Sequence, residues 1–159
     1  MPELLIREFQ PGDEAHFRRL NEEWIVRYFR LEAKDVQSLS DPHGTILDRS
    51  GRIFFAEQGG ETIGCCALVV LGPGEFEIAK MAVTASAQGQ GIGKRLLTHV
   101  IDEARSAGAR RLWLETNHAM IPAVRLYESL GFRHLPPERV TPSAYARSDV
   151  SMELLLTAS

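Results

Sequence analysis

A glycine-rich turn is the stretch of the sequence whose residue types and spacing point most directly to chemistry. It lies between a predicted strand and a predicted helix and reads Gln88-Gly89-Gln90-Gly91-Ile92-Gly93-Lys94. Glycines at alternate positions let the backbone bend sharply and approach a ligand closely. The helix that follows presents unpaired N–H groups and the positive end of its dipole. Together these features predict an anion-binding site suited to phosphate.

Two common nucleotide-binding patterns do not fit this turn. The Walker A pattern would need a glycine at position 88 and a Ser or Thr at position 95, which are Gln and Arg here, so the magnesium-binding hydroxyl is missing. The dinucleotide fingerprint fails in both registers, because Lys94 or Leu96 stands where the third glycine belongs. Glu115 lies about where a ribose-binding acid would be, so a nucleotide-dependent oxidoreductase stays as a disfavoured alternative.

The spacing that fits is Gln-x-x-Gly-x-Gly, at positions 88, 91 and 93. In this stretch the sequence resembles the GNAT superfamily of N-acetyltransferases, in which such a motif opens the helix that binds the pyrophosphate of acetyl-coenzyme A. The resemblance also extends over EIAKMAV at 77–83, LETN at 114–117 and AVRLYESLGF at 123–132, in the family's order. It covers positions 75–135 well, whereas the first third matches only in its order of elements.

The resemblance implies an α/β fold (α+β with a mixed sheet). An antiparallel N-terminal meander would be followed by a βαβ unit, with the cofactor in a splay between two parallel strands. It implies one acetyltransferase domain over 1–159 and an acyltransferase reaction that needs acetyl-coenzyme A and no metal. The acceptor would be a primary amine of a small molecule, amino acid or peptide, attacking the thioester directly in a ternary complex. A non-catalytic sensor that binds acetyl-coenzyme A is the alternative from a different class.

The resemblance also implies how the cofactor is held. The turn would bind the pyrophosphate, while the preceding strand would pair with the pantetheine arm and polarise the acetyl carbonyl through its N–H groups. The expected cofactor-binding residues are Met81, Ala82, Val83, Gln88, Gly89, Gln90, Gly91, Ile92, Gly93, Lys94, Asn117 and Tyr127. For Asn117 a helix cap stays an alternative, and Lys94 can equally be an exposed helix residue.

Tyr127 and Glu77 are the candidate catalytic residues. The family gives a tyrosine in this position the role of protonating the leaving thiolate, and a phenol with a pKa near 10 keeps its proton until a thiolate forms. Tyr127 can also be a core residue. Glu77 is the candidate base; strand periodicity predicts it on the face of Ala79 and Met81. Binding the cationic acceptor or lying on the surface are its alternatives, and Glu75 is the local competitor.

The acceptor is expected between positions 24–50 and 136–150. The candidate substrate-binding residues are Trp24, Tyr28, Glu77 and Tyr145. Arg27, Arg30 and Arg147 are further candidates, since a guanidinium can recognise a carboxylate; solvated surface positions are the alternative for these three.

Hydrophobic periodicity predicts the elements that position these residues. Strands are expected at 4–9, 53–57, 62–71, 76–83, 111–115 and 150–156, and a Gly59-Gly60 turn joins the second and third. Apolar stripes predict helices around 17–31, 92–104 and 123–130. Positions 34–51 are expected to be a loop with a short helix near 36–39. Strand, helix and strand over 76–115 predict a parallel βαβ unit.

Composition narrows the function classes. The 159 residues carry 18 Lys and Arg against 21 Asp and Glu, a net charge of −3, which argues against nucleic acid as a partner. No apolar run approaches a membrane span, and the N-terminus is unlike a secretory signal. Adjacent Cys65 and Cys66 are expected on opposite faces of a strand as buried, reduced thiols, so a cytoplasmic protein is expected. It is expected to be a monomer or a homodimer.

Overall fold

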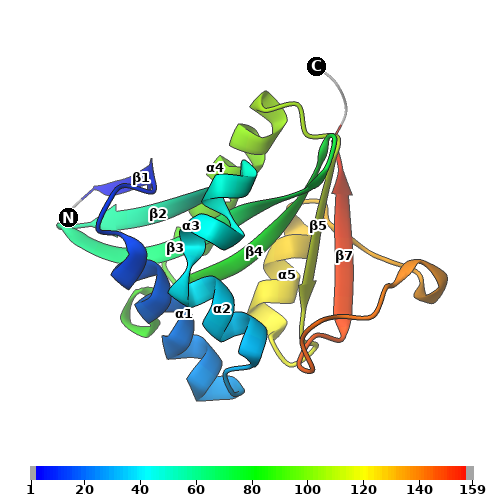
Figure 1. The fold of residues 1–159 in the computed structure, drawn as a ribbon, viewed down its shortest axis with the longest axis horizontal. Coiled ribbons are helices and arrows are strands. Elements are labelled where there is room, and N and C mark those ends of the chain that lie inside the picture. Colours follow the sequence, from blue (N-terminus) through cyan, green and yellow to red (C-terminus); the bar gives the residue numbers. More distant parts are fainter. Residues whose placement is uncertain (1–2, 157–159) are drawn as a thin grey trace.

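The computed structural model describes residues 3–156. Within them, seven strands form one sheet in the order β1-β2-β3-β4-β5-β7-β6 (Figure 1). The strands are β1 (Leu4–Glu8), β2 (Arg52–Gln58), β3 (Glu61–Gly72), β4 (Glu75–Val83), β5 (Arg111–Thr116), β6 (Arg133–His134) and β7 (Val150–Leu155). The first four pair antiparallel, β5 lies parallel to β4, and β7 is antiparallel to both β5 and β6. The predicted α/β class, with its meander and βαβ unit, is confirmed.

Helices cover both faces of this sheet. They are α1 (Glu14–Tyr28), α2 (Ala33–Ser40), α3 (Pro42–Thr45), α4 (Ile92–Ser106) and α5 (Ile121–Ser129), with 3-10 turns η1 (Leu47–Arg49), η2 (Ala85–Ala87) and η3 (Pro137–Arg139). Successive side chains of β2 point to opposite faces of the sheet. Phe55 packs in the cluster of α1 and α2, and Phe54 packs in the cluster of α4 and α5. The sheet is therefore buried between two layers of helices.

Positions 34–51 are more helical than the loop expected from their composition. Local capping explains the difference. Glu32 and Asp35 form a capping box at the start of α2. Pro42 occupies the first turn of α3, whose Asp41 accepts a hydrogen bond from the Gly44 N–H. Polar residues thus start two short helices here. The short helix expected near 36–39 is confirmed by α2, whereas the loop prediction was wrong at α3 and η1.

A β-bulge divides β4 in two. Lys80 has a φ of 53°, in the left-handed region that favours glycine, and the register with β3 shifts between its partners Ala67 and Cys65. The extra residue moves Ala82 to the face of Ala79 and turns Met81 to the face of α4 and α5. The prediction that Met81 shares the face of Glu77 was therefore wrong, because strict alternation does not cross a bulge.

The cysteines follow the predicted alternation. Cys65 and Cys66 are both free and buried, and they lie in different clusters on opposite faces of β3. Burial raises the pKa of both thiols, which makes them inert apolar groups at neutral pH. Gly59 and Gly60 take φ values of 61° and 80°, as a two-residue hairpin turn requires. In the described part of the chain, no helix is long and apolar enough to cross a bilayer.

Candidate active site

The two parallel strands of the sheet separate soon after they meet. β4 pairs with β5 only through Glu75, Phe76 and Glu77. Beyond Glu77 the strands diverge, and a cavity of about 580 Å³ opens there. This splay cavity is lined by the second half of β4, the glycine-rich turn, the first turn of α4 and the apolar face of α5.

The glycine-rich turn is shaped by backbone conformations that side chains would hinder. Gly89 and Gly91 have φ values of 81° and 77°, and Gly91 is the N-cap of α4. A Cβ on Gly93 would lie 3.4 Å from Met81 Cε and 3.6 Å from Leu126 Cδ2. The helix start therefore packs closely on β4 and α5 and points its free amides at the splay cavity.

Tyr127 closes the inner end of the splay cavity. Its ring packs edge-to-face on Phe132, with centroids 6.0 Å apart, and its hydroxyl lies 4.0 Å from Met81 Sδ. Burial raises the pKa of Tyr127 well above its ordinary value. The phenol therefore stays protonated, and within residues 3–156 its hydroxyl has only the weak sulfur acceptor of Met81, so a stronger acceptor can take its place.

The structure brings most of the predicted cofactor-binding residues together. The ones that line the splay cavity are Met81, Ala82, Val83, Gln88, Gly89, Gly91, Ile92, Gly93, Lys94 and Tyr127. Gln90 is exposed and lies outside this lining. Asn117 lines a neighbouring cavity, where its Nδ2 donates to the Arg147 carbonyl at 2.7 Å and its Oδ1 accepts from the Ala119 N–H at 2.8 Å. Its amide thus joins the segment after β5 to the segment of Arg147, and it does not cap α5, whose N-cap is Met120.

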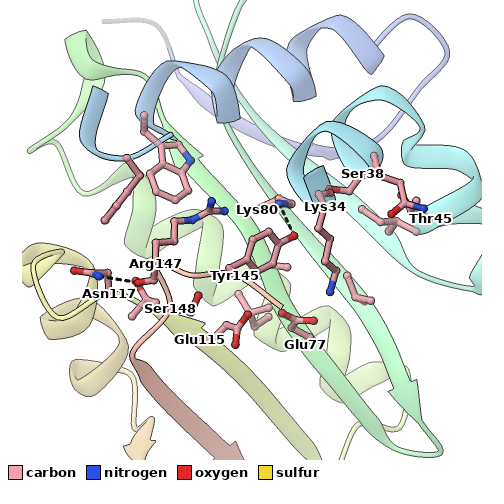
Figure 2. A pocket seen from close by; sticks show the side chains of 18 of the residues that line it. Lys34, Ser38, Thr45, Glu77, Lys80, Glu115, Asn117, Tyr145, Arg147 and Ser148 are labelled. Atoms are coloured by element: carbon pink, nitrogen blue, oxygen red, sulfur yellow. Dashed lines mark hydrogen bonds between the residues drawn. The ribbon is translucent and has the colours of Figure 1, made fainter. Parts of the chain in front are cut away.

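The neighbouring cavity, of about 390 Å³, is polar (Figure 2). It is bounded by α1, α2 and η1 on one side and by β4, β5 and positions 145–148 on the other. Glu77 lies on its strand wall beside Glu115, whose carboxylate accepts a hydrogen bond from Ser143 Oγ at 2.8 Å. Burial, together with the charge of Glu115, raises the pKa of Glu77 to about 7, although Lys34 and Lys80 oppose the rise.

Asp35 of α2 is hydrogen-bonded to residues of the opposite wall of this polar cavity. Its buried carboxylate accepts hydrogen bonds from Lys80 Nζ at 2.9 Å and from two Arg147 nitrogens at 2.6 and 2.7 Å. Lys80 Nζ also donates to the Tyr145 hydroxyl at 3.0 Å (Figure 2). Although burial alone would raise it, these hydrogen bonds hold the pKa of Asp35 at about 2. Asp35 and Lys80 escaped the sequence analysis because no motif links positions 35, 80 and 147.

The predicted acceptor residues have different surroundings. Trp24 lines both cavities, Tyr145 lines the polar cavity, and half-exposed Tyr28 lines the splay cavity. Arg147 faces the polar cavity, but its guanidinium is bound to Asp35 and lies 4.5 Å from the Tyr145 ring centroid. Arg27 lies over the Tyr28 ring. Arg147 is thus committed to Asp35, while Arg27 and Arg30 lie outside the lining of both cavities.

Within residues 3–156, no group of three or more His, Cys, Asp or Glu side chains is arranged to hold a metal ion. The two cavities hold a carboxylate with a near-neutral pKa, a protonated phenol and a set of backbone amides. These are the groups of general acid–base chemistry.

Several known proteins are similar to this chain in sequence. The model of the acetyltransferase (GNAT) family matches residues 6–132. The uncharacterized N-acetyltransferase YsnE of Bacillus subtilis is 42% identical over 84 residues, which are 52% of this chain but only 56% of YsnE. The IAA acetyltransferase of Azospirillum brasilense is 35% identical over 143 residues, 86% of this chain and 89% of that protein.

Solved structures share the fold. An acetyltransferase of the GNAT family from Staphylococcus aureus superposes with a TM-score of 0.87 at 19% identity, covering 98% of this chain and 100% of the other. The yncA protein of Salmonella typhimurium, solved with its cofactor acetyl-CoA, superposes with a TM-score of 0.77 at 20% identity, covering 98% and 95%. With its fold, its glycine-rich turn and its family match in agreement, this chain belongs to the acetyltransferase (GNAT) family.

Proposed function

We propose that this protein transfers the acetyl group of acetyl-coenzyme A to a primary amine, by direct attack in a ternary complex. The observation that carries the proposal is the contact between the two cavities, which share lining residues such as Trp24, Ala79 and Glu115. Glu77 lies in the polar cavity and Tyr127 in the splay cavity, on either side of β4. A base and an acid thus flank one strand edge, as acyl transfer between two bound substrates requires.

The residues of the splay cavity fit acetyl-coenzyme A. When bound, this coenzyme supplies an acetyl thioester and a thiolate leaving group. The positive φ of Gly89 and Gly91 and the close packing at Gly93 leave backbone amides, without side chains, to receive the pyrophosphate. The β4 edge beyond Glu77, unpaired with β5, offers its backbone to the pantetheine arm, and Met81, Ala82 and Val83 supply N–H groups for the acetyl oxygen.

Glu77 takes the proton of the attacking amine in this proposal, directly or through a water molecule. A carboxyl whose pKa is about 7 is ionised in half of the molecules at neutral pH and is a far stronger base than an ordinary glutamate. The amine nitrogen forms the new C–N bond while the C–S bond breaks. Tyr127 donates its hydroxyl proton to the departing sulfur and is reprotonated from solvent, to which Glu77 releases the proton that it took from the amine.

Acetyl-coenzyme A binding is tested first by thermal unfolding. Acetyl-coenzyme A or coenzyme A at 100 times its dissociation constant should add about 2.7 kcal/mol, which raises the Tm by roughly 5–10 °C for a chain of this size. NAD and ATP, in matched excess, should leave the Tm unchanged. A shift with either of these nucleotides alone would sink the acetyltransferase proposal.

The Tyr127→Phe variant separates catalysis from binding. It keeps the ring that packs on Phe132 and removes only the hydroxyl, so turnover should fall by about a hundredfold. The dissociation constant of acetyl-coenzyme A, measured by calorimetry, should stay within twofold. Unchanged turnover of the variant at saturating substrates would remove Tyr127 from the acid role. A wild type that binds acetyl-coenzyme A but transfers no acetyl group would favour the sensor alternative.

Glu77→Gln tests the base. The rate of the wild type should rise with pH as Glu77 ionises near pH 7, which gives the pH–rate profile an acidic limb. In Glu77→Gln, whose amide cannot titrate, this limb should flatten. Glu75→Gln is the matched control, because the Glu75 carboxylate is half-exposed and paired with Arg111. An acidic limb that persists in Glu77→Gln would assign the base to another group.

A further inference from the structure

The polar cavity carries opposite charges on its two walls. The strand wall holds the carboxylates of Glu77 and Glu115. The helical wall, formed by α2, α3 and η1, holds Lys34 and Arg49 among neutral polar residues. Figure 2 shows the Lys34 side chain reaching from α2 into the cavity toward the strand that carries Glu77.

Only some of the cations around the cavity are available to a ligand. Lys80 and Arg147 are both committed to the buried carboxylate of Asp35. Lys34 lies 5.3 Å from the Tyr145 ring centroid, and Arg49 uses its Nε to bind the Gly44 carbonyl at 3.0 Å. Within residues 3–156 neither Lys34 nor Arg49 forms an ion pair. Two cations therefore face the cavity without a carboxylate partner, and a hydrogen bond already orients one of them.

Apolar side chains also line the polar cavity. They include Trp24, Phe29, Ile46, Val69, Leu71 and Met120. Such side chains accommodate a hydrocarbon group between the charged walls. The volume of about 390 Å³ is that of a small-molecule site.

We propose that the acceptor is a free amino acid with an apolar side chain, an inference that rests on the proposed acetyl transfer. Its amine lies toward Glu77 and Glu115, and its carboxylate binds Lys34 and Arg49. Figure 2 shows the Lys34 side chain directed toward the strand that carries Glu77, so a ligand that contacts both residues can be short, as an α-amino acid is. A polyamine would bring a second cation against Lys34, and a simple amine would leave both cations unpaired.

The test compares amines that differ only in the carboxylate. Release of the coenzyme A thiol is followed with the full chain, acetyl-coenzyme A and two matched pairs: L-leucine with isoamylamine, and L-phenylalanine with phenethylamine. Rates are expressed per concentration of deprotonated amine, because the carboxylate lowers the pKa of its neighbour. Each amino acid should exceed its partner amine in kcat/KM by roughly 10- to 100-fold, the range for a hydrogen-bonded charged group.

Two variants test whether Lys34 and Arg49 cause the preference for amino acids. In Lys34→Gln and in Arg49→Gln, the ratio of kcat/KM for leucine to that for isoamylamine should fall at least fivefold. Arg105→Gln removes the same charge from the end of α4, where Arg105 is exposed and paired with Asp102. This control should keep the ratio of the wild type.

The possible results separate this inference from the function on which it rests. Equal or better use of the decarboxylated amines, of spermidine or of a peptide N-terminus would overturn the amino-acid acceptor and leave acetyl transfer standing. A preference for amino acids that survives in both cation variants would overturn the assigned carboxylate site. If no compound in the panel reacts, the amino-acid acceptor is overturned, and the thermal shift with acetyl-coenzyme A decides the proposed function independently.

Discussion

The splay cavity and the polar cavity lie against the same strand and are built in different ways. The splay cavity is formed largely by backbone, with glycines that keep side chains away from the start of α4. The polar cavity is formed by charged side chains from segments far apart in the sequence, among them Asp35, Lys80 and Arg147. The first arrangement suits a ligand common to a whole family, and the second gives one member its own acceptor.

The β4 bulge is where the two constructions meet. It turns Met81 toward Tyr127 and leaves Lys80 bonded to Asp35, so neighbouring side chains have partners on opposite sides of β4. One irregular residue thus supplies both a wall of the splay cavity and a member of the Asp35 cluster. Substitutions in the two cavities should therefore have different effects: mainly on the free energy of unfolding at the Asp35 cluster, and mainly on coenzyme binding in the splay cavity.

The largest effect should come from Asp35→Ala. The change leaves Lys80 without a countercharge and Arg147 with only its 3.4 Å contact to Glu32, in a largely buried site, and breaking a buried ion pair typically costs about 3–5 kcal/mol. Chemical denaturation at pH 7 would measure the loss. Asp102→Ala, at an exposed pair with Arg105, is the control and should cost less than about 0.5 kcal/mol.

The stability difference between the wild type and Asp35→Ala should also depend on pH. The pKa of Asp35 is about 2 in the folded state against an ordinary 3.8, so its contribution to stability is complete above about pH 4. That contribution disappears as the pH falls through 2, where the folded carboxylate is protonated. The difference in unfolding free energy between wild type and Asp35→Ala should therefore shrink below pH 4; a difference that is independent of pH would mean that packing, not charge, holds the cluster.

On the splay side, Gly93→Val should weaken binding more than folding. A branched side chain would press on Met81 and Leu126, which line the splay cavity, so the dissociation constant of coenzyme A should rise by about 10- to 100-fold. Gly72→Val is the control, since a Cβ on Gly72 meets nothing within 4 Å. Equal affinity in the two variants would show that the close approach at Gly93 does not shape the coenzyme site.

The contrast also explains what could be predicted from sequence. The antiparallel meander and the parallel βαβ unit were predicted from the periodicity of the chain. The anion-binding turn was predictable because its determinants are contiguous: the glycines at 89, 91 and 93 stand at the start of one amphipathic helix. The polar cavity was not, because the pairing of Asp35 with Lys80 and Arg147 depends on how α2 packs and on a bulge that period-two alternation cannot reveal.

The role of Asn117 shows the same limit. The residue type and its place after β5 agree with a cofactor contact, yet its amide is used to hold the Arg147 carbonyl and the Ala119 N–H. Which partner a polar side chain takes is decided by loops that close over it from elsewhere in the chain. Local sequence fixes the position of such a residue and leaves its partner open.

The smallest effect should be a gain of stability in Glu77→Gln at alkaline pH. The folded pKa of Glu77 is about 7 against an ordinary 4.5, so between these values the folded state binds more protons than the unfolded state. Stability therefore falls as the pH rises from 4.5 to 7, and the cost of the ionised carboxylate is complete above 7. A neutral amide of the same shape avoids this cost.

At pH 8, Glu77→Gln should be about 1 kcal/mol more stable than the wild type, a value reduced from the full pKa shift because Glu77 is partly solvated. At pH 4, where both states protonate the wild-type carboxyl, the two proteins should unfold together. Glu75→Gln should show no such divergence with pH. A base kept at the expense of stability is what a functional carboxylate in the polar cavity predicts, and a Glu77→Gln variant equally stable at both pH values would make Glu77 an ordinary surface residue.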